Sequence, residues 1–147
     1  MDDNKTMGFY LGRTHQNLIN YLSYEFKEFN ITPEQWILLN ILKEKDGISQ
    51  KELAIKSGKK QTTITRALDN LYKKNYIQRE ASADDRRVFL IFLTSEGSHL
   101  LEQLTPIAHF LLKEIFVEFS QEEADQLKML LMKLNGAIDQ KFGRVRY

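Results

Sequence analysis

Residues 49–94 read SQKELAIKSGKKQTTITRALDNLYKKNYIQREASADDRRVFLIFLT, and this stretch decides the fold of the chain. Ser49 can cap a short helix, and Glu52 three residues later completes a capping box. Gly58 suits the turn after this helix, because glycine adopts a left-handed backbone conformation without a steric penalty. The inward face of the helix is expected to hold Leu53, Ala54 and Ile55. Together these signals predict the first half of a helix–turn–helix unit.

A second helix is predicted over residues 61–74, and its two sides differ in chemistry. Apolar residues at helical spacing mark the buried side, namely Ile64, Ala67, Leu68 and Leu71. The other side shows hydroxyl, amide and guanidinium groups, from Gln61, Thr62, Thr63, Thr65, Arg66 and Asn70. Such groups can reach base edges or phosphates in the major groove of DNA. Asn75 is expected to follow this helix in a left-handed conformation, a role that asparagine can fill.

A two-stranded ribbon should follow this second helix. Its strands are predicted over residues 77–80 and 88–93, and Ile48 is expected to add a short strand against them. The polar tip at 81–87 carries Asp85, Arg86 and Arg87. A basic hairpin beside a DNA-contacting helix is a wing, whose arginines can enter the narrow minor groove.

The segment 85–94, DRRVFLIFLT, fits the wing pattern D-x-R-x5-L-T of MarR-type transcription regulators. The upstream pattern resembles their helix–turn–helix, with matching residues at Leu53, Gly58, Thr63, Ile64, Thr65, Arg66, Leu71 and Ile77. The resemblance implies a homodimeric winged helix that regulates transcription from promoter DNA. The chain departs from the family's usual pattern at Lys59 and Lys60, which replace an apolar residue and a serine cap. Both changes add positive charge on the DNA side.

The resemblance also implies a small-molecule effector, frequently aromatic or anionic, bound between the dimerisation helices and the winged part. The candidate effector residues are Arg13, His15 and Trp36. An alternative interpretation makes Trp36 a plain core residue and His15 a satisfied polar group. A metal sensor is a further alternative, with Glu96, His99 and Glu102 on one helix face near His15. Ordinary histidines explain the same pattern, so no metal and no cofactor are expected.

Charge is distributed unevenly along the chain, although the net charge is only +1. Residues 56–87 hold nine Lys or Arg against four Asp or Glu, whereas residues 94–127 hold one against seven. This asymmetry predicts a basic face over the helix–turn–helix and wing, and an acidic helical body. A charge run alone fits a solvated surface equally well, so the DNA interpretation depends on the motif beside it.

The rest of the chain reads as helices with more apolar surface than one small core needs. A long helix is predicted over residues 7–29, and capping signals at Thr32, Thr94 and Ser120 predict the starts of three others. Surplus apolar faces on the first and last helices predict contact with a second copy of the chain.

The expected fold class is therefore all-α with a small β-wing. We expect a single MarR-type domain over residues 1–147, in which residues 32–94 form the winged helix–turn–helix. The helices of residues 1–31 and 95–147 would form the dimerisation body of a homodimer.

Several other classes of protein are disfavoured by composition. The chain has no cysteine, no apolar run near the roughly 20 residues of a spanning helix, and a polar, acidic start unlike a signal peptide. A cytoplasmic protein without a membrane partner is expected. No nucleophile–base arrangement or glycine-rich phosphate loop stands out, so an enzyme is not expected.

The sequence therefore predicts a sequence-specific DNA-binding transcriptional regulator. In particular it predicts a ligand-responsive repressor that acts as a homodimer on a pseudo-palindromic operator. The competing hypothesis is a winged helix used as a protein-interaction module, which would favour apolar residues on the second helix. The residues expected to contact double-stranded DNA are Lys59, Lys60, Gln61, Thr62, Thr63, Thr65, Arg66, Asn70, Asp85, Arg86 and Arg87.

Overall fold

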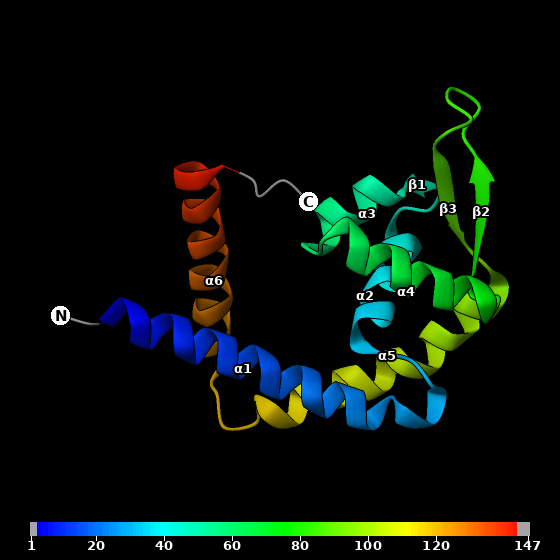
Figure 1. Ribbon diagram of the computed structural model, residues 1–147. Helices are drawn as coiled ribbons and strands as arrows, with labels where there is room; N and C mark the ends of the chain where they lie inside the picture. The colour runs from blue at the N-terminus through cyan, green and yellow to red at the C-terminus, as the bar shows by residue number, and fades with distance from the viewer. Residues whose placement is uncertain (1–2, 144–147) are drawn as a thin grey trace.

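The computed structural model describes residues 3–143, with side chains from residue 6 onward. The elements in chain order are α1 (Asp3–Glu25), the 3-10 helix η1 (Lys27–Phe29), α2 (Pro33–Glu44), β1 (Ile48–Ser49), α3 (Gln50–Ser57), α4 (Gln61–Lys73), β2 (Ile77–Ala81), β3 (Phe89–Leu93), α5 (Ser95–Ile115) and α6 (Gln121–Phe142). The predicted all-α class with a small β-wing is confirmed. In Figure 1, α3, α4 and the wing lie on one side of α2, and α1 and α5 run along the other.

One hydrophobic core joins the winged unit to the first half of α5. Its largest fully buried side chains are Phe26, Leu38, Leu39, Leu42, Leu53, Ile64, Leu68, Leu71, Ile77, Ile91, Leu101 and Leu104. The apolar side predicted for α4 is confirmed, because Ile64, Ala67, Leu68 and Leu71 are all buried. In contrast, no described side chain of α1 or α6 is buried. Both helices extend beyond the core that the rest of the chain forms (Figure 1).

The start of α3 differs from the predicted capping pattern. The Ser49 hydroxyl accepts a hydrogen bond from the Glu52 backbone N–H at 3.2 Å, as expected. The reciprocal half is not made, because the Glu52 carboxylate instead pairs with the Lys45 ammonium at 2.8 Å. The expectation for Ile55 is also wrong, since this residue is 44% exposed and only Leu53 and Ala54 of the predicted trio are buried.

The other predicted helix boundaries depend on local backbone chemistry. Complete capping boxes form at Thr32 with Gln35 and at Ser120 with Glu123. The predicted helix 7–29 is not continuous: α1 ends at Glu25, and a 3-10 turn follows that ends at Asn30 in a left-handed conformation with φ of 53°. The left-handed residues predicted after α3 and α4 are confirmed, with φ of 68° at Gly58 and 62° at Asn75.

The wing belongs to a three-stranded antiparallel sheet in the order β1-β3-β2. Ile77 pairs with Leu93 and Ala81 with Phe89, so β2 and β3 form a regular hairpin stem. Ile48 pairs with Ile91, which confirms the short additional strand expected before α3. The sheet therefore ties the entry to the helix–turn–helix to the base of the wing.

A tight contact fixes where α5 leaves the sheet. The Thr94 hydroxyl caps α5 by accepting from the Gly97 N–H at 3.0 Å and donates to the Asn75 carbonyl at 2.7 Å. Gly97 lies so close to the preceding turn that a Cβ there would be 2.2 Å from the Tyr76 carbonyl oxygen. This contact holds the first turn of α5 against the link between α4 and β2.

Candidate nucleic-acid interface

The exposed side of α4 forms the centre of the candidate interface. Thr62, Thr63, Thr65, Arg66 and Asn70 are exposed, opposite the buried residues of the same helix. Figure 1 shows α3 beside α4 and the wing extending from the same side of the molecule. The residues predicted to reach DNA from α4 therefore lie on one accessible surface.

The first turn of α4 is positively charged. Lys60 occupies the N-cap position without a side-chain cap hydrogen bond, and the first turn contains no acidic residue. The preceding Lys59 is half-buried and Lys60 is exposed. The positive end of a helix dipole beside lysine ammonium groups favours an anion such as a phosphate.

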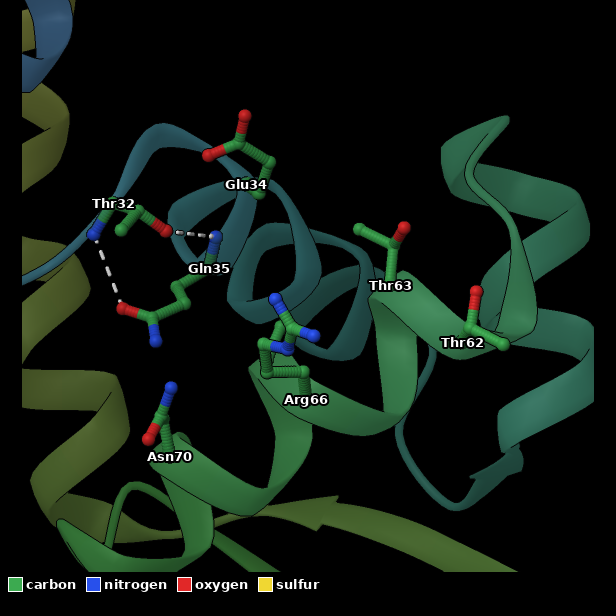
Figure 2. A pocket seen from close by; sticks show the side chains of 8 residues that line it. Thr32, Glu34, Gln35, Thr62, Thr63, Arg66 and Asn70 are labelled. Carbon is green, nitrogen blue, oxygen red and sulfur yellow. Dashed lines mark hydrogen bonds between the residues drawn. The ribbon is translucent and has the colours of Figure 1, made fainter.

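A hollow of about 280 Å³ separates α4 from the start of α2, and it is lined by Thr32, Glu34, Gln35, Thr62, Thr63, Arg66, Ala67 and Asn70. Figure 2 shows the Arg66 and Asn70 side chains projecting from α4 beside this hollow, with Glu34 on the α2 side. Thr32 and Gln35 are held there by their reciprocal capping bonds of 3.1 and 3.2 Å. The sequence alone does not assign α2 residues to this surface, because their nearness to α4 is a tertiary contact.

Thr65 is held from the neighbouring helix. Its hydroxyl donates to the Gln61 carbonyl at 2.9 Å and accepts a hydrogen bond from the Gln50 side-chain amide at the start of α3. The same amide also approaches the Gln61 carbonyl at 3.5 Å. Gln50 is thus part of the interface, although no local sequence signal distinguishes it from a solvated helix residue.

A brace connects α4 with the wing. Arg79 on β2 donates to the Asp69 carboxylate on α4 at 2.6 Å, and its guanidinium lies 5.2 Å from the centre of the Tyr72 ring. An ion pair combined with a cation–π contact restrains the arginine in two directions. These side chains, which lie outside the expected DNA-contact set, therefore help to hold the hairpin stem against α4.

The wing tip is organised by Asp85. Its carboxylate accepts from the Arg87 backbone N–H at 3.0 Å, and from the Arg87 Nε and Nη2 at 3.1 and 3.2 Å. The Arg87 side chain remains 90% exposed in this arrangement, so pairing orients the guanidinium without burying it. Among the described residues Arg86, which is also exposed, makes no ion pair.

The same contacts set the protonation of Asp85. Hydrogen bonds from the Arg87 side chain, and then from its backbone N–H, lower the pKa of Asp85 from its ordinary value of 3.8. Because the pKa is lowered in the folded protein, the pairing contributes to folding stability at every pH above 3.8. This contribution is lost only as the pH falls below that value. The wing tip therefore keeps this arrangement throughout the neutral pH range.

Comparison with known proteins identifies the group to which this architecture belongs. The family model described as "MarR family" matches residues 31–89, from the residue before the α2 cap to the wing. The chain is 32% identical over 124 residues to the HTH-type transcriptional regulator PapX of Escherichia coli, covering 83% of this chain and 76% of PapX. The chain belongs to the MarR family.

The chain is also similar to two further proteins. It is 34% identical over 97 residues to the transcriptional repressor MprA of Escherichia coli K12, which is 66% of this chain but only 55% of MprA. The chain thus spans about half the length of that relative. The crystal structure of an S. aureus MepR–DNA complex superimposes with a TM-score of 0.79 at 26% identity, covering 89% of this chain and 95% of MepR.

The MarR wing pattern has a local physical explanation in this structure. Asp85 and Arg87 form the paired tip, and Thr94 caps α5. Lys60, where the family often has a serine cap, leaves the start of α4 without a side-chain cap. The helix nevertheless begins where it was predicted to begin, at Gln61.

The three residues considered for an effector differ in their exposure within one chain. Arg13 and His15 are exposed on α1, whereas Trp36 is half-buried with its ring 5.6 Å from that of Phe26. Arg13 lies twelve residues before the end of α1 at Glu25, roughly 18 Å along the helix axis. Arg13 and His15 are two residues apart on α1, so they point to different sides of the helix.

The described residues also bear on metal and membrane binding. Within residues 3–143, no group of three or more His, Asp or Glu side chains could hold a metal ion, including the set around His99. None of the helices in this part of the chain is long and apolar enough to cross a membrane.

Proposed function

We propose that this chain is a sequence-specific DNA-binding regulator that represses transcription. We place it in the cytoplasm and do not expect it to be an enzyme. The observation that carries the proposal is the exposed polar side of α4, braced to a wing with two accessible arginines. Major-groove recognition by a helix and minor-groove contact by arginines both need such groups. The MepR–DNA complex and the repressor name of MprA support this proposal by likeness. A protein-interaction module would need apolar residues where α4 has threonines.

We further propose that two copies act together. The α6 helix leaves an apolar stripe open to solvent, with Leu127, Leu130, Leu131, Leu134 and Ile138 each at least 40% exposed. A groove of about 460 Å³ between α1 and α5 is also open. An isolated helix gains little stability without packing such a stripe, so a second chain is the natural partner. A symmetric dimer places two recognition helices about 34 Å apart on a pseudo-palindromic operator.

Selection of bound sequences from random duplex DNA is the experiment that tests this function. A DNA-binding homodimer should enrich a pseudo-palindrome with half-sites about one helical turn apart. Failure to enrich any sequence, together with weak and uniform binding to all duplexes, would contradict sequence-specific regulation.

Arg66→Ala should weaken binding to the selected operator by about 1–3 kcal/mol, as expected for a bidentate contact to a base pair. The Arg66 side chain is exposed and makes no ion pair among the described residues, so the melting temperature should hardly change. Lys113→Ala removes one positive charge from α5 and serves as the matched control. Equal affinity of Arg66→Ala and wild type would show that α4 is oriented differently on DNA.

Alanine substitutions of the two wing arginines should reduce operator affinity in different ways. Arg87→Ala should lose affinity most on operators with A·T-rich flanks, because a narrow minor groove attracts an inserted guanidinium. Arg86→Ala should weaken binding to all sequences similarly and lower the salt slope by about one unit, as for a phosphate contact. Titrations at several salt concentrations, on A·T-rich and G·C-substituted flanks, measure both effects. Equal loss on both flanks for Arg87→Ala would reduce the Asp85–Arg87 pair to a brace of the hairpin.

A small-molecule effector, aromatic or anionic, is part of the same proposal. The exposed Arg13 guanidinium favours α1 as the place where an anionic group would be held. Displacement of labelled operator by a panel of aromatic carboxylates tests for such an effector. Arg13→Ala should then weaken the response without changing DNA affinity in the absence of ligand.

A further inference from the structure

The three threonines on the exposed side of α4 are not chemically equivalent. The Thr65 hydroxyl donates its proton to the Gln61 carbonyl and accepts from the Gln50 amide. Within the described residues, neither the Thr62 nor the Thr63 hydroxyl makes a hydrogen bond to another side chain or to the backbone, although both are exposed. Two of the three hydroxyls are therefore available to DNA and the third is already engaged.

The engaged hydroxyl determines what Thr65 can present to a ligand. Phosphate oxygens accept hydrogen bonds but do not donate them, and the single Thr65 hydroxyl proton is directed at the Gln61 carbonyl. Turning that proton toward a phosphate would break this bond. With the oxygen already engaged by the helix backbone and by α3, the methyl group is the part of this exposed side chain that is left for a new contact.

The position of Thr65 suits a contact with a base edge. It is the fifth residue of α4, it precedes Arg66, and it is exposed while Ile64 behind it is buried. Residues in the N-terminal part of a recognition helix contact base edges in the major groove. Of the groups that base pairs present there, the thymine C5-methyl is the apolar one, and a threonine methyl is a suitable partner.

We propose that Thr65 is a specificity-determining residue that recognises one thymine in each half-site by methyl–methyl contact. The proposal rests on the proposed DNA-binding function and assigns Thr65 a different role from Thr62 and Thr63, whose hydroxyls can donate to phosphates or bases. The chemical class recognised is a 5-methylpyrimidine in the major groove.

The test replaces each thymine of one half-site of the selected operator, one at a time, by 2′-deoxyuridine. This change removes only the C5-methyl and keeps every hydrogen-bonding group of the base pair. Wild-type protein should lose affinity about fourfold at one position, the equivalent of roughly 0.8 kcal/mol for one buried methyl-sized group. Binding is measured by fluorescence anisotropy at fixed salt.

Three variants assign the lost contact to its side chain. Thr65→Ser keeps the hydroxyl and its two hydrogen bonds but lacks the methyl, so it should bind the thymine and deoxyuridine operators equally at that position. Thr65→Val keeps methyl groups and lacks the hydroxyl, so its ratio between the two operators should remain about fourfold. Thr63→Ser, the matched control on the other flank of α4, should leave the position-specific ratio unchanged.

The outcomes separate this proposal from the function on which it rests. If wild-type protein enriches no operator, the DNA-binding function itself fails. Wild-type protein could instead bind an operator and lose affinity at no deoxyuridine position, or lose it equally in Thr65→Ser. Either result would overturn the thymine contact while DNA binding stands. The affinity ratio between the thymine and deoxyuridine operators could also stay at about fourfold in Thr65→Ser and fall to about one in Thr65→Val. This result would assign recognition to the hydroxyl and would also overturn the proposal.

Discussion

The double variant Leu130→Glu/Leu134→Glu is expected to be monomeric at micromolar concentration. Both residues belong to the exposed apolar stripe of α6, and no described residue of this helix is buried within its own chain. In a symmetric dimer the two substitutions place four carboxylates in one interface. At about 1 kcal/mol for each unpaired polar group, dimerisation should weaken roughly a thousandfold. Gel filtration with light scattering measures the change.

The variant Gln126→Glu/Gln140→Glu is the matched control, because it adds the same two charges to α6 away from the apolar stripe. It should remain dimeric, and circular dichroism should show that both variants stay helical. The monomeric variant should also lose most of its operator affinity, since its two half-sites would be bound by separate chains. A leucine variant that stays as dimeric as the control would show that α6 is not the interface.

Gly97→Ala is expected to cause a large loss of folding stability. A Cβ at this position would lie 2.2 Å from the Tyr76 carbonyl oxygen and 2.8 Å from Leu93 Cδ1. The backbone oxygen cannot move aside without shifting the turn between α4 and β2, which also accepts the Thr94 N–H at 3.2 Å. Overpacking of this kind costs about 3 kcal/mol, which lowers the melting temperature by roughly 10 °C.

Gly136→Ala provides the control for the same chemical change. Gly136 lies within α6, and a Cβ there would meet nothing within 4 Å. Alanine should stabilise this helix by about 0.5–1 kcal/mol, because glycine is the poorer helix former. Thermal denaturation of both variants should therefore show shifts of opposite sign. A melting temperature of Gly97→Ala equal to that of wild type would mean that α5 can move away from the Tyr76 turn.

The elements that could be predicted from the sequence are those set by local chemistry. Apolar spacing identified the buried side of α4, and the caps at Thr32, Thr94 and Ser120 identified three helix starts. Left-handed residues after α3 and α4 were also predictable, because glycine and asparagine tolerate that conformation. Each of these signals lies within a few residues of the feature that it determines.

The features that could not be predicted depend on contacts between separate elements. The Gln50–Thr65 bond joins residues fifteen apart, and the Arg79–Asp69 pair joins residues ten apart across a turn. The capping box expected at Ser49 is incomplete for the same reason, because the Lys45 ammonium from the preceding turn attracts the Glu52 carboxylate. Neither the spacing of apolar residues nor a short sequence motif predicts how one helix is oriented relative to its neighbour.

The brace between Asp69, Arg79 and Tyr72 has a consequence for the DNA rather than for the protein. If both proposed contacts are made, this brace should hold constant the number of base pairs between the major-groove and minor-groove contacts of one half-site, because it restrains α4 relative to the hairpin stem. In the proposed dimer, the number between the two half-sites would depend instead on α1, α5 and α6. One base pair inserted between these two contacts should therefore abolish recognition of the half-site. Changes in the base sequence of the central spacer, at constant length, should be tolerated.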